Sequence, residues 1–209
     1  MGINNPQSVE VTLKDNSKIK ISFFPGDIVI DCGASVGDVT ALFADKGAAV
    51  FSYEPNPHAY SILSKRFENT KNVKCINSAV HTTDGISKLY FHENSSEDPL
   101  KYSTGSSLKS EKTNVDCDDF AEVPTVDLAK FIKKIKKATG KNVCVLKVDI
   151  EGAECELIQH LIDEDVLRDI SYVFVETHEM KNQFLLEATK NMKKRVVKEG
   201  LANINFDWI

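Results

Sequence analysis

Residues 29–38 carry the sequence Val29-Ile30-Asp31-Cys32-Gly33-Ala34-Ser35-Val36-Gly37-Asp38. An apolar run gives way here to small residues, and the two glycines let the backbone turn tightly and approach a ligand closely. We therefore expect a buried strand over 27–32, a tight turn and a helix over 36–46. In doubly wound sheets ligands bind beyond the carboxyl ends of the strands, so this turn is a candidate binding site.

Short apolar runs alternate with amphipathic stretches through the rest of the chain. Further strands are expected at 48–53, 73–80, 88–91, 143–150, 170–176 and 202–208, and helices at 59–67, 127–138, 155–162 and 183–198. This alternation indicates an α/β fold with a mostly parallel, doubly wound sheet.

The N-terminal segment has a different pattern. Alternating apolar residues on both sides of Asp15-Asn16-Ser17 predict a β-hairpin. We expect a hairpin extension over 1–26 and one domain over 27–209. The apparent strand at the very end suggests a domain excised from a longer protein.

The overall composition narrows the classes of function. A net charge of −5 and 42% hydrophobic residues are typical of a soluble globular protein rather than a nucleic-acid binder. The lysines of 133–137 are expected on the solvated face of a helix. No apolar run suffices for a membrane span, and no signal segment is found. Five cysteines without a Cys-x-x-Cys pair favour a reduced, cytoplasmic location.

The segment 93–122 is polar and long for a loop without secondary structure. Such a loop either covers a binding site or is disordered. The sequence Gly105-Ser106-Ser107-Leu108 favours a cover.

The glycine turn admits several kinds of chemistry. A dinucleotide site is disfavoured, because Ser35 stands where Gly-x-Gly-x-x-Gly needs its middle glycine and Asp38 would repel a pyrophosphate. A serine hydrolase stays open as an alternative. Residues 33–37 fit Gly-x-Ser-x-Gly, and Asp149 and His178 follow as acid and base. A non-catalytic domain that binds a nucleoside or glycan is another alternative.

The interpretation that uses most residues is a site for S-adenosylmethionine. Glu54 ends the second core strand, 23 residues after Asp31, where a carboxylate can accept both hydrogen bonds of an adenosine ribose. S-adenosylmethionine is cationic at its sulfonium and ammonium groups and has no pyrophosphate. It therefore suits a site that bears Asp31, Asp38 and Glu54.

Over about 27–178 the chain resembles the FkbM-type methyltransferase family. The motifs that carry the resemblance are residues 31–38, Glu54-Pro55-Asn56-Pro57, Ser78-Ala79-Val80, Val123-Pro124-Thr125-Val126-Asp127-Leu128, Lys147-Val148-Asp149-Ile150-Glu151-Gly152-Ala153-Glu154 and Glu176-Thr177-His178. It implies a Rossmann-like class I methyltransferase fold and O-methylation, often of sugar hydroxyls in glycans or glycosylated metabolites. Glycosyltransferases are then expected as fused or co-operating partners.

The same resemblance implies the cofactor-binding residues. By the resemblance, Asp31, Gly33, Ser35 and Gly37 surround the methionine part of the cofactor. Glu54, followed by Pro55 and Asn56, binds its ribose. Ser78 and Ala79 lie beside the adenine.

An alcohol is a poor nucleophile at neutral pH, so its proton must pass to a base or its oxygen must bind a metal. Asp149, Glu151 and His178 are the catalytic candidates, because they follow buried strands and emerge at the crevice. A histidine pKa suits proton transfer near pH 7. Glu151 could equally be a helix cap. A divalent cation (Mg²⁺ or Mn²⁺) bridged by Asp149 and Glu176 is a further hypothesis.

For two charged residues close in sequence to these candidates we expect structural roles. Glu154 falls in the first turn of a helix, where a carboxylate stabilises the helix dipole. Lys147 lies within a buried strand, so we expect it to pair with a carboxylate.

Overall fold

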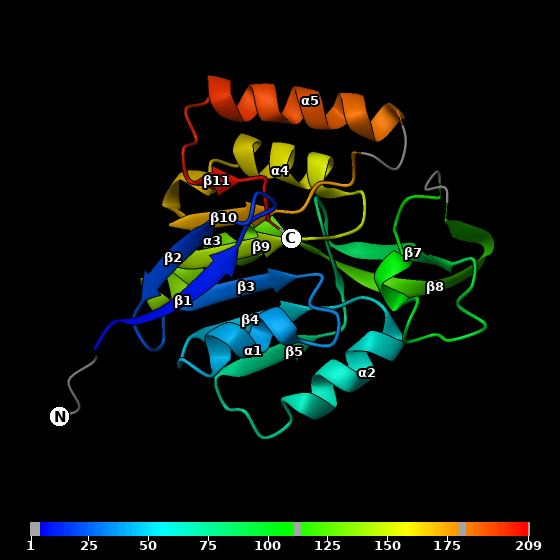
Figure 1. Ribbon diagram of the computed structural model, residues 1–209, viewed down its shortest axis with the longest axis horizontal. Helices are drawn as coiled ribbons and strands as arrows, with labels where there is room; N and C mark the ends of the chain where they lie inside the picture. Colours follow the sequence, from blue (N-terminus) through cyan, green and yellow to red (C-terminus); the bar gives the residue numbers. More distant parts are fainter. Residues whose placement is uncertain (1–4, 111–113, 180–182, 209) are drawn as a thin grey trace.

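A computed structural model describes residues 5–110, 114–179 and 183–208 of the chain. Its centre is a six-stranded parallel sheet in the order β11-β10-β9-β3-β4-β5 (Figure 1). The strands are β3 (Ile28–Cys32), β4 (Ala49–Tyr53), β5 (Val73–Ile76), β9 (Val143–Val148), β10 (Tyr172–Val175) and β11 (Ile204–Asn205). Numbered along the chain, they lie in the order 3-2-1-4-5-6, the order of a Rossmann fold. The predicted α/β, Rossmann-like, doubly wound fold is confirmed.

The two central strands show why the chain folds this way. Every residue of β3 and β9 is buried, as expected for near-continuous apolar runs in a parallel sheet covered on both faces. They pair in a register that sets Asp31 beside Lys147 and Cys32 beside Val148. The strand order reverses between β3 and β9, which is where such sheets bind ligands.

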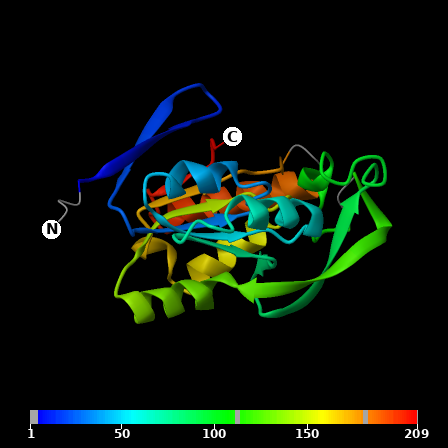
Figure 2. The same cartoon turned by 90° about the horizontal axis from the view of Figure 1, so that it is seen from below.

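Helices and the hairpin cover the two faces of the sheet. The helices are α1 (Asp38–Ala44), α2 (Pro57–Arg66), α3 (Leu128–Thr139), α4 (Glu154–Asp163) and α5 (Gln183–Lys198), with short 3-10 turns η1 (Ser103–Gly105) and η2 (Leu167–Asp169). Apolar side chains of α3, α4 and α5 share one core cluster. The opposite face packs against α1 and the hairpin, as Figure 2 shows.

The N-terminal hairpin, β1 (Gln7–Thr12) and β2 (Lys18–Phe23), belongs to this core. Its inward side chains Val9, Val11, Ile21 and Phe23 are buried in one cluster with residues of β3, β9 and β10. The end of the chain packs beside it. Trp208 is 5% exposed and tilts against Phe174 with ring centroids 5.0 Å apart. Leu13 pairs with Trp208 in an isolated bridge.

A second, three-stranded sheet lies beyond the carboxyl ends of β3 and β4 (Figure 1). Its strands are β6 (Ala79–His81), β8 (Val115–Asp127) and β7 (Gly85–His92). The single strand expected at 73–80 is therefore wrong: it is divided between two sheets. Asn77 causes the break, because its side-chain amide donates to the carbonyl oxygens of Glu54 and Pro55 and turns the chain away.

Three other boundaries differ from prediction. The strand expected at 88–91 extends over the whole of β7, and residues 115–122, expected within a loop, belong to β8. The last strand is only β11, because the chain after it bends toward the hairpin. Among the described residues, no helix combines the length and apolar character needed to cross a membrane.

Candidate active site

A cleft that is partly open to solvent lies at the carboxyl ends of β3, β4 and β9. The predicted cofactor residues that line it are Gly33, Ser35, Glu54, Pro55, Asn56 and Ala79. Val80 and Leu89 add an apolar wall, and Asp149 and Glu151 form the opposite end. Asp31, Gly37 and Ser78 do not line the cleft.

The turn after β3 brings two strand ends unusually close. Gly33 has φ +77°, and a Cβ there would lie 1.8 Å from the carbonyl oxygen of Asp149. The N–H groups of Gly33 and Ala34 both donate to the carbonyl oxygen of Tyr53, at 2.9 Å. Ser35 follows with φ 49°, also in the left-handed region. The turn therefore requires glycine at position 33 and is tied to the end of β4.

Glu54 is 6% exposed and connects two loops of the cleft. Its Oε2 accepts from the N–H of Ser35 and its Oε1 from the N–H of Asn56, both at 2.8 Å. Burial raises the pKa of Glu54 to about 7, although these two hydrogen bonds favour the charged form. Each carboxylate oxygen has a second lone pair, so Glu54 can still accept hydrogen bonds from a ligand.

Asp31 lies beneath the turn. It is fully buried, and its Oδ2 accepts from the hydroxyl of Thr40 at 2.7 Å. Lys147 Nζ donates to the carbonyl oxygen of Gly33 at 2.7 Å and lies 3.5 Å from Asp31 Oδ1 and 3.3 Å from Asp149 Oδ2. Burial alone would lower the pKa of Lys147, but the charges of Asp31 and Asp149 raise it. The expected carboxylate partner of Lys147 is confirmed, and Asp31 supports the turn through it.

Asp38 and Gly37 have structural roles. The Asp38 side chain is 82% exposed and forms an ion pair of 2.6 Å with Arg66. The expectation that Asp38 belongs to the acidic surroundings of the cofactor is therefore wrong, because the carboxylate points to solvent. Gly37 has φ +92° at the start of α1, and a Cβ there would lie 2.5 Å from the ring of Phe67.

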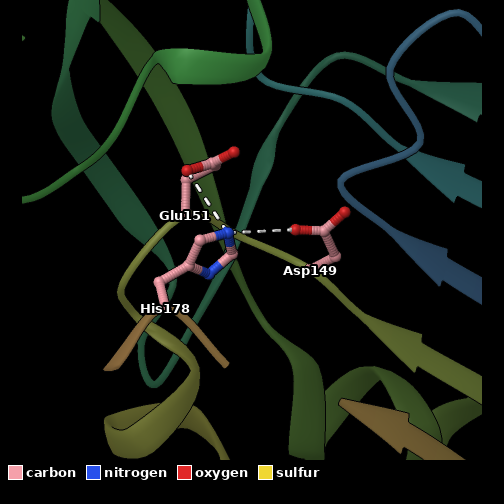
Figure 3. Close-up of side chains that lie close together, drawn as sticks. All are labelled: Asp149, Glu151 and His178. Carbon is pink, nitrogen blue, oxygen red and sulfur yellow. Dashed lines mark ion pairs between the residues drawn. The ribbon is translucent and has the colours of Figure 1, made fainter. Parts of the chain in front are cut away.

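Asp149, Glu151 and His178 come together at the other end of the cleft (Figure 3). His178 Nε2 lies 3.4 Å from Glu151 Oε2 and 3.7 Å from Asp149 Oδ1. The backbone turns sharply between the two carboxylates, since Glu151 has φ 58° and Gly152 has φ +111°. This turn directs Glu151 back toward His178, as the close-up shows.

Glu154 holds this cluster in place, a role that the sequence did not indicate. It is 2% exposed, and Oε1 accepts from the N–H of Ile150 and of Gly152, both at 3.1 Å. His178 Nδ1 donates to the same oxygen at 2.9 Å. The expectation that Glu154 only stabilises a helix dipole is wrong, because its carboxylate points back into the turn.

The surroundings of His178 change its expected role. Burial alone would lower the pKa of His178, but hydrogen bonds to Glu151 and Glu154 and their charges raise it to about 10. A base must be neutral to take a proton, so the expectation that the His178 pKa suits proton transfer near pH 7 is wrong. His178 instead acts as a positive group between carboxylates.

The metal pair of Asp149 and Glu176 stays a prediction. Among the described residues, the cluster with metal-ligand spacing consists of Asp149, Glu151 and His178, and Glu176 is not in it. Glu176 lies near enough for the Asp149 charge to add to the effect of burial, and both raise its pKa.

Residues 103–108, between β7 and β8, cover part of the cleft. Ser103, Thr104, Ser106, Ser107 and Leu108 line the cavity, in agreement with the covering role expected for 105–108. Asn56 Nδ2 donates to Ser106 Oγ at 3.0 Å, and Ser107 Oγ donates to the carbonyl oxygen of Glu151 at 2.7 Å. The cover therefore contacts both ends of the cleft.

Comparison with known proteins identifies the family of the chain. Residues 31–197 match the Methyltransferase FkbM domain family. A solved structure of the methyltransferase FkbM from Methylobacillus flagellatus KT is similar at 13% identity and a TM-score of 0.46, covering 81% of this chain and 37% of that one. No curated protein matches the sequence. Because the family match spans most of the chain, the protein belongs to the FkbM methyltransferase family.

Proposed function

We propose that this protein is an S-adenosylmethionine-dependent O-methyltransferase, with a sugar hydroxyl of a glycan or glycosylated metabolite as acceptor. The observation that carries the proposal is the buried Glu54 carboxylate beside the glycine turn, at the strand end where Rossmann-like folds bind a ribose. Glycosyltransferases are the enzymes expected to supply such an acceptor.

The polarity of the cleft lining supports this choice of cofactor. S-adenosylmethionine supplies an electrophilic methyl group when it is bound. Glu54 has free lone pairs for the two ribose hydroxyls, and Ala79, Val80 and Leu89 give an apolar wall that suits an adenine ring. Gly33 lets the turn that carries Ser35 lie against the main chain of Asp149. Carboxylates at Glu54, Asp149 and Glu151 favour a ligand with cationic groups.

The other end of the cleft suits a hydroxyl acceptor. Asp149 and Glu151 are partly exposed carboxylates, able to accept a hydrogen bond from an alcohol and then its proton. Ser103, Thr104, Ser106 and Ser107 of the cover line the same space, and hydroxyl groups of this kind can pair with further hydroxyls of a sugar. Lys147 and His178 position the two carboxylates.

The hydrolase alternative loses support from the contacts of its three residues. Ser35 donates its backbone N–H to Glu54, and His178 is held by Glu154 and Glu151 rather than by Ser35. A protonated histidine cannot activate a serine hydroxyl.

Titration calorimetry with S-adenosylhomocysteine tests the cofactor half of the proposal. Glu54→Ala should weaken binding by about 10- to 100-fold, because a hydrogen bond to a charged group contributes about 1.5–3 kcal/mol. Asp38→Ala is the matched control, since its carboxylate points to solvent, and it should leave the affinity unchanged. Equal affinities for wild type and Glu54→Ala would overturn the ribose assignment.

The acceptor half is tested by methyl transfer from a labelled cofactor to a panel of glycans and glycosylated metabolites. Label should appear as an ether on a sugar oxygen. Cofactor binding without transfer to any member of the panel would instead support a non-catalytic binding domain.

A further inference from the structure

We propose that Asp149, Glu151 and His178 form a binding site for one divalent transition-metal ion, with Mn²⁺ as the best match to the ligands. Each side chain offers one ligand atom, and the three atoms all lie within 4.8 Å of one another. The role given to the ion below rests on the proposed function, whereas its binding does not.

The spacing of the three atoms fits one octahedral ion. Ligands about 2.1 Å from a metal lie about 3 Å apart in neighbouring positions and about 4 Å apart in opposite ones. The distances from His178 Nε2, 3.4 Å to Glu151 Oε2 and 3.7 Å to Asp149 Oδ1, fall between these values. Figure 3 shows the two carboxylates on different sides of Nε2, and both would have to turn toward it to become neighbouring ligands of one ion.

His178 is held as metal-binding histidines usually are. Its side chain is 7% exposed, and Nδ1 donates to Glu154, so that Nε2 faces the two carboxylates. A ligating histidine typically donates its other ring N–H to a carboxylate in this way. Glu154 is itself fixed by the N–H groups of Ile150 and Gly152. The ligand direction is therefore set before any ion arrives. The ion would take the place of the Nε2 proton, which is released on binding because a metal binds the neutral ring.

The charges of the surroundings favour a cation. Asp149, Glu151, Glu154 and Glu176 gather at this end of the sheet, and the neighbouring Lys147 is shared with the buried Asp31. Two carboxylates and one imidazole form a mixed oxygen and nitrogen set. Carboxylates suit Mg²⁺, Ca²⁺ and Mn²⁺, and imidazole suits transition metals, so Mn²⁺ is the carboxylate-preferring ion that the added imidazole favours.

The position of the site gives the ion a role in the proposed reaction. Asp149 and Glu151 line the cleft, so an ion held by them would lie beside the space assigned to the acceptor. A divalent ion there would bind the acceptor oxygen and lower the pKa of its hydroxyl group.

Electron paramagnetic resonance of Mn²⁺ added to the chelator-treated full chain tests the inference. We expect one bound Mn²⁺ per chain. Outer carboxylates alone contribute 10- to 100-fold to metal affinity, so Glu151→Gln and His178→Ala should each weaken binding by at least about 100-fold. Glu154→Gln, which removes no ligand but weakens the support of His178 and of the turn at Ile150 and Gly152, should weaken Mn²⁺ binding by about 10- to 100-fold.

Glu176→Gln is the matched control, because it removes a nearby charge that is not a ligand. It should change Mn²⁺ affinity by less than about fivefold. Thermal unfolding of each variant shows whether it folds. If His178→Ala does not fold, Glu151→Gln still tests the site. No Mn²⁺ binding up to about 1 mM, or equal losses in Glu151→Gln and Glu176→Gln, would overturn the site. S-adenosylhomocysteine binding measured on the same sample separates this failure from a failure of the proposed function.

Discussion

Replacing Gly33 by alanine tests the close approach of β3 and β9 on which the cleft depends. The added Cβ would lie 1.8 Å from the carbonyl oxygen and 3.0 Å from the carbonyl carbon of Asp149. Both are main-chain atoms, so no side-chain rotation relieves the overlap. To restore a separation of 3.0 Å from the oxygen, the two strand ends must move apart by about 1.2 Å.

The cost of this change has three parts. A residue with a Cβ loses about 1–2 kcal/mol in the left-handed conformation that Gly33 adopts with φ +77°. Forced repacking adds about 1–3 kcal/mol. Parting the strand ends also weakens the hydrogen bond from Asp149 N–H to the Cys32 carbonyl, worth about 1 kcal/mol. The Gly33→Ala variant should therefore lose about 3–6 kcal/mol, a large part of the stability of a typical domain.

Urea unfolding followed by the fluorescence of Trp208, the single tryptophan, measures this loss. Gly140→Ala is the matched control, because Gly140 also has a positive φ, +69°, but nothing lies within 4 Å of an added Cβ. Gly140→Ala should lose only about 1–2 kcal/mol. If Gly33→Ala lost no more free energy of unfolding than Gly140→Ala, the close approach of the strand ends would be refuted.

Three further predictions concern Glu54, Ser35 and Lys147, which lie at or beneath the glycine turn. The Glu54 pKa of about 7 means that acid neutralises the group proposed to bind the ribose, so S-adenosylhomocysteine affinity should fall about tenfold from pH 8 to pH 6. Glu54→Gln should flatten this pH profile, and a flat wild-type profile would contradict the assignment. Ser35→Ala should keep most methyl transfer, because Ser35 contributes its backbone N–H, whereas a serine hydrolase would lose all activity. Lys147→Met leaves Asp31 buried without its cation and should cost about 3–5 kcal/mol in chemical unfolding, partly recovered by adding Asp31→Asn. No recovery in the double variant would show that the charge of Asp31 is not the cause.

The parts of the fold predicted from sequence are those with a local signal. The central strands β3 and β9 are continuous apolar runs, and the glycine turn after β3 follows from Gly33 and Gly37. Strand β8 gives no such signal. Its first half is exposed and rich in aspartate, and only its antiparallel pairing with β7 makes it a strand. Pairing between distant segments is not visible in a local pattern.

The residues of the site also differ in whether a local sequence signal could predict them. Glu54 could be placed in the cleft because it directly follows a buried strand. The environment of His178 could not be predicted, because its raised pKa depends on Glu151 and Glu154, which approach it only in the folded chain. Glu154 also looked like an ordinary first-turn carboxylate. Its backbone partners arise from the left-handed turn at Glu151 and Gly152, and sequence periodicity does not report such a turn.

The packing of the hairpin shows that the core of the folded protein extends beyond the segment that the family match covers. The family match covers residues 31–197, yet the apolar side chains of the hairpin and Trp208, all outside that range, cover one face of the central sheet. The two flanks also meet each other, through the Leu13–Trp208 bridge and a 2.7 Å hydrogen bond from Lys14 N–H to the Asp207 carbonyl. A chain trimmed to the matched range would expose apolar surface over β3, β9 and β10 to water and tend to aggregate. Any shortened version intended for expression should therefore keep both flanks together.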